Sequence, residues 1–183
     1  EDEYNEFYQH QFSDYEDPMH VIHSKVEGAT TFTSLLFIPK KAPFDLYSEK
    51  FEKGLQLYSK GVFIMDKNKQ LIPDYFRFVR GLVDSSDLSL NISREMLQHD
   101  RLLKKIAVSV ESKIKSELEK MQKNNREQYN EFYKIYGINL KYGIYEGFGI
   151  NKEKLQDLIM FKTTESTEFR TLAEYVEAMK EDQ

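Results

Sequence analysis

From Arg101 to Met121, apolar residues recur every three or four positions, which is the periodicity of one long amphipathic helix. Lysine and glutamate fill the opposite face. An amphipathic helix is stabilised mainly by packing its apolar stripe on a neighbouring element. The pattern therefore predicts a long helix that covers other structure. Its apolar positions are Leu102, Leu103, Ile106, Val110, Ile114, Leu118 and Met121.

The residues before this helix favour a β-sheet. The segments His20–Lys25 and Thr30–Ile38 are rich in β-branched and aromatic residues, with a turn signal at Glu27 and Gly28, and predict a hairpin. The residues at 35–38 are all apolar, so helices should cover both faces of the second strand. A short helix is predicted over Glu3–Phe12, strands over Leu55–Tyr58 and Gly61–Met65, and an apolar segment over Phe76–Val83.

The residues after Asn124 and Asn125 change character. Helices are predicted around residues 126–136, 152–161 and 172–180, and glycines punctuate the sequence between them. We expect an α+β (α/β) fold, in which a β-sheet with covering helices occupies residues 1–123. An all-helical subdomain then occupies residues 124–183.

Composition excludes several classes of protein. The chain of 183 residues is 40% hydrophobic and 31% charged, which is typical of a globular domain with a real core. A net charge of −5 argues against a general nucleic-acid binder. The absence of cysteine excludes disulfides and fits a reducing, cytoplasmic compartment. No apolar run approaches the roughly 18 residues of a membrane helix, and a start at Glu1 predicts a fragment of a longer protein.

The sequence predicts no metal site and no autonomous active site. His20 and His23 are three residues apart on a predicted strand, so they point to opposite faces and cannot share a metal ion. His10 and His99 are isolated in the sequence. No phosphate-binding loop, nucleophile elbow or Ser/His/Asp arrangement is visible. We therefore expect this segment alone not to be an enzyme.

The most unusual local chemistry follows the last predicted strand. Asn91 and Ser93 are good N-cap residues, so a helix should begin here. Arg94 then lies in the first helical turn, where a cation is unfavourable, and such a departure is typical of a binding residue. Gln98 would share its face, and the two side chains together would suit an anion such as a γ-phosphate. The alternative is that Arg94 only pairs on the surface with Asp87 or Glu95.

A second notable stretch runs from Pro39 to Tyr47. Pro39 and Pro43 keep it out of helix and sheet, so Phe44, Leu46 and Tyr47 should lie in a loop. Exposed apolar loops often bind partner proteins. The alternative is that these side chains fold back onto the core.

Several stretches resemble the middle domain of the heat-shock protein 90 chaperone family. The segments Ser34–Leu46, Phe78–Ser85 and Leu90–Gln98 are similar to signature stretches of that family. Near the ends, Glu3–Tyr8 and Thr171–Val176 resemble its bacterial, high-temperature protein G branch. The resemblance therefore spans essentially the whole chain.

The resemblance implies a role in another domain's ATP site. In this family a separate N-terminal domain holds ATP and Mg, and a middle-domain arginine reaches the γ-phosphate when the chaperone closes. Carried over by motif, that arginine is Arg94, with Gln98 as its neighbour and Asn91 and Ser93 supporting the loop. The full-length chaperone would then be an ATPase, whereas this fragment would hold no cofactor. Ser89 departs from the proline of many relatives, which should leave the loop freer.

The same resemblance implies partners. The loop at Ala42–Tyr47 is similar to the family's amphipathic loop, so Phe44, Leu46 and Tyr47 are expected to contact client proteins. The chain lacks the tryptophan that some relatives have in this loop. We expect a monomeric fragment of a homodimer, with the Arg94 segment mobile or retracted before docking, and no membrane or nucleic-acid partner. The alternatives are a non-catalytic interaction scaffold, a self-sufficient phosphatase and an RNA-binding sheet.

Overall fold

The computed structural model of the protein describes residues 2–89, 97, 100–164 and 166–179. It consists of two compact units, Glu1–Lys115 and Ser116–Gln183. The predicted long helix is present as α3 (Arg101–Asn124), which runs from the first unit into the second. The two units divide within this helix, whereas the predicted boundary lies at its end, so the division into residues 1–123 and 124–183 stays a prediction. The α+β fold class is confirmed.

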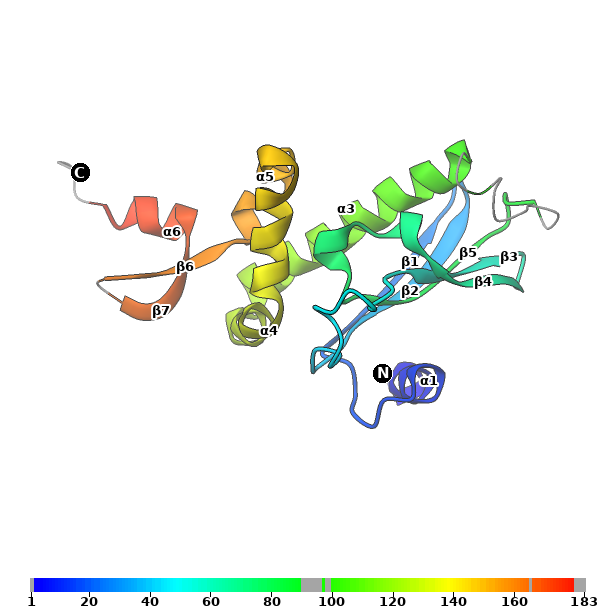
Figure 1. Cartoon of the computed structure of the whole chain (residues 1–183), viewed down its shortest axis with the longest axis horizontal. Helices are drawn as coiled ribbons and strands as arrows, with labels where there is room; N and C mark the ends of the chain where they lie inside the picture. The colour runs from blue at the N-terminus through cyan, green and yellow to red at the C-terminus, as the bar shows by residue number, and fades with distance from the viewer. Residues whose placement is uncertain (1, 90–96, 98–99, 165, 180–183) are drawn as a thin grey trace. The chain divides into compact units, whose positions relative to one another are not determined.

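The first unit is built on a five-stranded mixed sheet with the order β1-β2-β5-β3-β4 (Figure 1). All neighbouring strands are antiparallel except β3 and β5, which are parallel. The predicted hairpin is confirmed as β1 and β2, in which His20 faces Ile38 and Val26 faces Phe32. The strands are β1 (His20–Val26), β2 (Phe32–Ile38), β3 (Leu55–Ser59), β4 (Val62–Asn68) and β5 (Arg80–Ser85).

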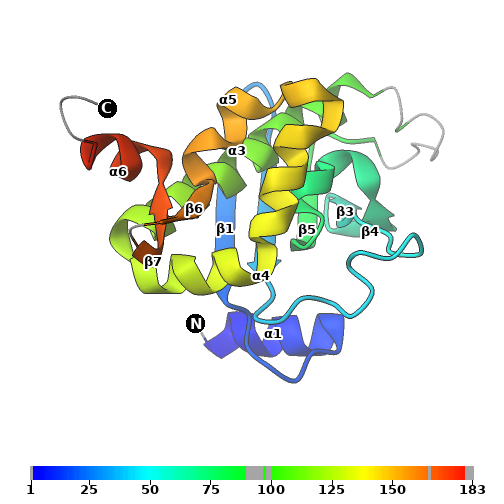
Figure 2. The same cartoon turned by 60° about the vertical axis from the view of Figure 1, so that its left-hand side comes forward.

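Strand β2 is covered on both faces, as its apolar run predicts. Helix α1 (Asp2–Phe12) packs on one face, where its aromatic rings surround Phe37 at centroid distances of 5.2 to 6.1 Å. The first part of α3 lies on the other face (Figures 1 and 2). The short helices η1 (Lys69–Leu71) and η2 (Asp74–Phe76) connect β4 to β5. From η2, the Tyr75 hydroxyl donates a hydrogen bond of 2.8 Å to Glu111 of α3.

The second unit contains α4 (Arg126–Tyr145), which is longer than the predicted helix over residues 126–136. The prediction stopped at Gly137 because glycine usually disfavours helix interiors. Here Gly137 lies against Tyr133, and an added Cβ would come within 2.9 Å of that ring. The glycine therefore makes room for an aromatic side chain whose hydroxyl donates to the Met160 carbonyl at 2.8 Å.

The expectation that residues 124–183 are all helical is corrected. An antiparallel hairpin, β6 (Met160–Thr163) and β7 (Ser166–Thr171), replaces the end of the helix predicted over residues 152–161. Phenylalanine and clustered threonines at residues 161–167 favour strand, because β-branched and aromatic side chains fit a pleated surface. The other elements of this unit are η3 (Glu146–Gly149), α5 (Lys152–Leu155), η4 (Gln156–Leu158) and α6 (Leu172–Glu177).

Gly81, on β5, lies very close to the backbone of β2. It has a φ of +145°, and a Cβ at this position would lie 2.2 Å from the backbone oxygen of Leu35 on β2. Gly28 has almost the same φ, +149°, but nothing lies within 4 Å of its Cβ position. The two glycines therefore share the backbone constraint and differ in the space around them.

We expect Gly81→Ala to lower the free energy of unfolding by about 3 kcal/mol or more, since backbone strain and a steric clash add. Gly28→Ala should cost only the strain, about 1 kcal/mol. Urea denaturation of both variants measures the difference. Equal losses in the two variants would show that the close approach of β5 to β2 is unimportant.

Candidate functional site

The loop between β2 and β3 presents two of the three residues predicted to contact clients. Phe44 is fully exposed, and Tyr47 is 60% exposed. Leu46, between them, is 0% exposed, so its side chain is available to a partner only if the loop opens. The structure thus separates two surface aromatic residues from one buried anchor.

Consecutive turns hold this loop in shape. The Leu46 amide donates to the Pro43 carbonyl at 3.0 Å, and the Ser48 amide donates to the Asp45 carbonyl at 2.8 Å. The backbone hydrogen bonds and the buried Leu46 together keep Phe44 and Tyr47 turned toward solvent.

The predicted phosphate-contacting residues lie outside the described part of the chain. These are Arg94 and Gln98, with the supporting Asn91 and Ser93. The prediction that the Arg94 segment is mobile or retracted before docking falls on the same residues. Their roles therefore stay predictions.

The described residues next to this motif, and Leu97 within it, are well anchored in the first unit. Leu88 and Leu97 are each 2% exposed. The Ser59 hydroxyl of β3 donates to the Leu88 carbonyl at 2.7 Å. Asp100 then caps α3, because its Oδ1 accepts from the backbone amides of Leu102 at 2.7 Å and Leu103 at 3.0 Å. Sequence reasoning missed this cap, although an aspartate directly before the periodic stretch is the usual signal.

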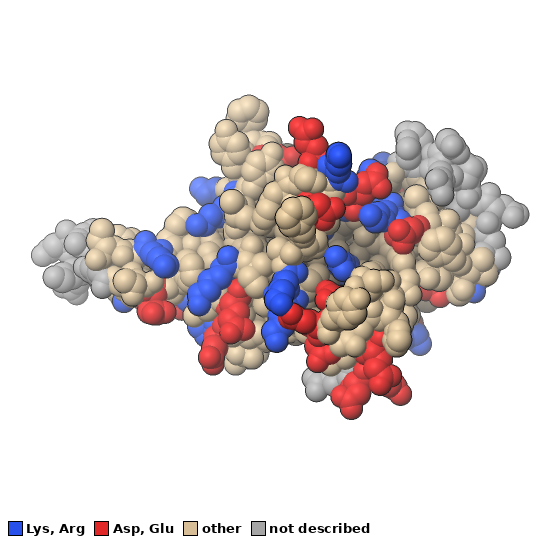
Figure 3. All heavy atoms as spheres, turned by 60° about the horizontal axis from the view of Figure 1, so that its bottom comes forward, with Lys and Arg blue, Asp and Glu red and all other residues tan. Residues whose placement is uncertain are grey.

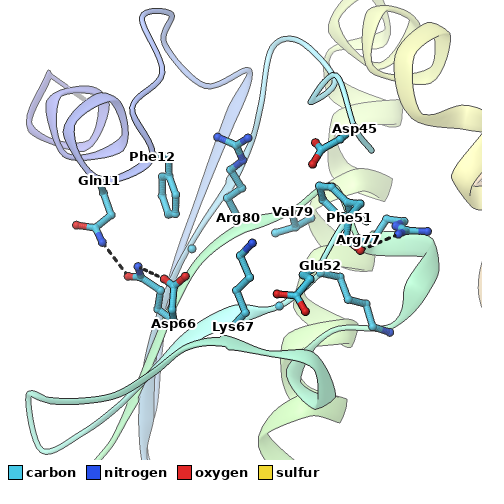
Figure 4. Close-up of a pocket in the computed structure, with 14 residues that line it drawn as sticks. Gln11, Phe12, Asp45, Phe51, Glu52, Asp66, Lys67, Arg77, Val79 and Arg80 are labelled. Atoms are coloured by element: carbon cyan, nitrogen blue, oxygen red, sulfur yellow. Dashed lines mark hydrogen bonds between the residues drawn. The ribbon is translucent and has the colours of Figure 1, made fainter. Parts of the chain in front are cut away.

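A polar pocket of about 290 Å³ in the first unit was also missed by sequence reasoning (Figure 4). The end of α1, the loop after β2 and strands β3, β4 and β5 contribute its walls. Its aromatic walls are Phe12 and Phe51. Because the lining residues come from five separate segments, no local sequence pattern could reveal the pocket.

The carboxylate of Asp14 interacts electrostatically with Arg80, which lines this pocket. Partial burial opposes its ionisation, but hydrogen bonds from the Tyr8 hydroxyl, at 2.7 Å, and from backbone amides outweigh that effect. The positive charge of Arg80 acts in the same direction as the hydrogen bonds. The pKa of Asp14 therefore lies below its usual value.

Charges of both signs are interspersed on the face seen in Figure 3, which shows no continuous basic stripe.

His23 is hydrogen-bonded through Nδ1 to the Tyr4 hydroxyl at 2.8 Å. Among residues 2–89, 97, 100–164 and 166–179, no cluster of three potential metal ligands occurs. Within the same ranges, no helix combines the length and apolar character needed to cross a membrane.

A family model described as Hsp90 protein matches residues 1–183, the entire chain. The chain belongs to the Hsp90 family. The chaperone protein HtpG of Clostridium perfringens is 53% identical over 183 residues, and that of Clostridium acetobutylicum is 56% identical over the same length. Each alignment covers 100% of this chain and 29% of the relative, so the chain spans less than a third of these Hsp90 proteins.

A similar solved structure shows which part of an Hsp90 protein this chain corresponds to. The middle domain of a Plasmodium falciparum heat shock protein is similar, with a TM-score of 0.84 and 31% sequence identity. The alignment covers 100% of this chain and 71% of that one. The chain is therefore a middle segment of an Hsp90 chaperone of the HtpG type, as its sequence resemblance predicted.

The anchor role of Leu46 predicts an asymmetry within the amphipathic loop. Leu46→Ala should lower the free energy of unfolding by about 2 to 5 kcal/mol, because it leaves a cavity in the core. Phe44→Ala, two residues away, should change it by less than about 0.5 kcal/mol, because the ring is fully exposed. Thermal and urea unfolding of the two variants test this, and similar losses for both would contradict the assigned burial.

Proposed function

We propose that this segment works in an ATP-dependent chaperone, where it completes the ATP site of a separate N-terminal domain and contacts client protein. The match of the entire chain to the Hsp90 family carries this proposal. The motif at Leu90–Gln98 supports it, because it resembles the family's arginine-containing stretch. The full-length protein would bind ATP and Mg in the N-terminal domain and hydrolyse ATP there.

Arg94 would act on the γ-phosphate from outside the nucleotide-binding domain. Its guanidinium offers several N–H donors in a planar fork that matches phosphate oxygens. Charge spreads over those oxygens during phosphoryl transfer, so a cation placed there lowers the barrier. Gln98 would hydrogen-bond the same group, while Asn91 and Ser93 would hold the loop. Because the arginine arrives from a second domain, hydrolysis would occur only after docking.

Phe44 and Tyr47 would contact the client. Both are exposed on a loop shaped by turns, and non-native proteins expose apolar segments that lack partners. Leu46 would hold the loop rather than touch the client directly. We further propose that the full-length chaperone is a cytoplasmic homodimer, whereas this segment alone is a monomer without enzymatic activity.

The second candidate function is a non-catalytic interaction scaffold. The exposed Phe44 and Tyr47 favour it, since they present a binding surface that needs no nucleotide. In that case Arg94 would only anchor its own loop. The two functions differ in what the loss of Arg94 does to turnover.

In the matching full-length chaperone, we expect Arg94→Ala to lower the rate of ATP hydrolysis by about 10³-fold or more, since the cation acts mainly in the transition state. Nucleotide affinity should change little, because a separate domain holds ATP. Steady-state hydrolysis and equilibrium nucleotide binding give the two numbers. Arg101→Ala, which removes an exposed arginine at the start of α3, is the control and should keep normal turnover. Unchanged turnover in Arg94→Ala would favour the scaffold.

A double variant, Phe44→Ser with Tyr47→Ser, should weaken binding of a non-native client by about tenfold or more, because two exposed aromatic contacts are lost. Thermal stability should stay within a few degrees of the parent, since neither ring belongs to the core. Fluorescence anisotropy with a labelled unfolded protein measures the affinity. Client binding at the parent level would remove this loop from the proposed contact surface.

A further inference from the structure

Several charged side chains line the polar pocket in the first unit, and not all of them are paired. Four cationic side chains line it, together with three carboxylates. The carboxylates are Asp45, Glu52 and Asp66, and the cations are Lys53, Lys67, Arg77 and Arg80.

Several of these charges are already engaged. Lys53 forms an ion pair of 2.9 Å with Asp74, and Glu52 forms one of 3.1 Å with Lys69. Asp66 accepts a hydrogen bond of 3.0 Å from the Gln56 side chain, whose oxygen accepts from Gln11 at 3.1 Å. These contacts hold the walls of the pocket in place, and Figure 4 shows the hydrogen bonds that lead from Gln11 to Asp66.

Lys67 and Arg80 remain with open donors. Among the described residues, neither side chain forms a hydrogen bond or an ion pair. The Arg80 guanidinium lies over the Phe12 ring, 5.9 Å from its centroid. It also interacts electrostatically with the Asp14 carboxylate, without an ion pair. Lys67 interacts only at long range with Glu52. Both residues line the pocket, and in Figure 4 Lys67 points toward Arg80, whose guanidinium lies beyond it on the Phe12 side.

Arg77 forms the far wall and adds a further open donor. Its guanidinium stacks over the Phe51 ring at 5.0 Å and donates a long hydrogen bond of 3.4 Å to the Phe51 carbonyl. Its Nε is buried without a partner in the described structure.

We propose that this pocket binds the carboxylate of an aspartate or glutamate from a polypeptide segment, with Arg80 and Lys67 as its direct contacts. The planar guanidinium fork of Arg80 matches a carboxylate, and Lys67 supplies a second, mobile donor. The Phe12 ring, which lies beside Arg80, would contact the aliphatic part of the acidic side chain. A volume of about 290 Å³ suits one side chain, because it lies at the lower limit of ligand pockets.

The charge balance favours a carboxylate over a phosphate. Although four cations and three carboxylates line the pocket, the charge of Arg80 also acts on Asp14 outside it, so the region has little excess positive charge. A phosphate would bring nearly two negative charges next to Asp45, whose side chain has no cationic partner among the described residues. The same Asp45 carboxylate could accept a backbone N–H from the bound segment. The site is independent of the proposed role of Arg94.

The test titrates the ¹⁵N-labelled chain with a blocked Ala-Glu-Ala peptide and follows the arginine Nε and the Gly54 and Gly81 amide signals by NMR. We expect saturable shifts with a Kd of about 1 mM, which corresponds to roughly 4 kcal/mol for one anchored side chain. Lys67→Gln should weaken this binding by about tenfold. Lys104→Gln removes an exposed lysine of α3 outside the pocket and should leave the Kd unchanged.

Two control ligands test whether the binding requires a carboxylate. A blocked Ala-Gln-Ala peptide should not bind, and inorganic phosphate at the same ionic strength should bind more weakly than the glutamate peptide. Equal binding of either probe, or equal losses in Lys67→Gln and Lys104→Gln, would overturn the proposal. Arg80→Gln provides a second variant, whose folding is checked by its thermal midpoint, and normal peptide affinity in this folded variant would also overturn it.

Discussion

The close contact between β2 and β5 is the constraint on which the first unit depends. Where Gly81 faces Leu36, the two backbones leave no room for a side chain. Strand β2 is thereby held between β1 and β5, with Phe37 under the aromatic rings of α1. The antiparallel register also decides where the two segments with proposed functions leave the sheet. Phe37 faces Arg80, whereas Phe32 faces Ser85, so the amphipathic loop and the Leu90–Gln98 motif leave opposite ends of the strand pair.

Much of the fold could be predicted from periodicity. The long helix, the β1–β2 hairpin and the two-sided covering of β2 follow from local patterns, because period and burial are linked directly in amphipathic elements. Helix α4 extends beyond its predicted end because Tyr133 uses the space beside Gly137, a contact that propensity does not include. The β6–β7 hairpin was missed because short apolar segments are ambiguous between helix and strand.

The candidate site was less predictable, for a different physical reason. Phe44, Leu46 and Tyr47 have similar apolar character in the sequence, yet burial separates Leu46 from the other two. That separation depends on which core residues lie beneath the loop, and no local pattern encodes it. The polar pocket is a stronger case, since α1, a loop and three strands contribute to it. By contrast, the Hsp90 assignment depends on continuous motifs, which a single sequence displays in full.

The turns and the buried Leu46 have a consequence for the thermodynamics of recognition. A loop that must become ordered on binding loses conformational entropy, and this loss is subtracted from the affinity of its contacts. Here the Pro43–Leu46 and Asp45–Ser48 hydrogen bonds fix the backbone before any partner arrives. In the proposed client contact, the entropic cost would then fall almost entirely on the client chain. Discrimination among clients would accordingly reflect how readily each one can be immobilised, as much as the side chains it offers.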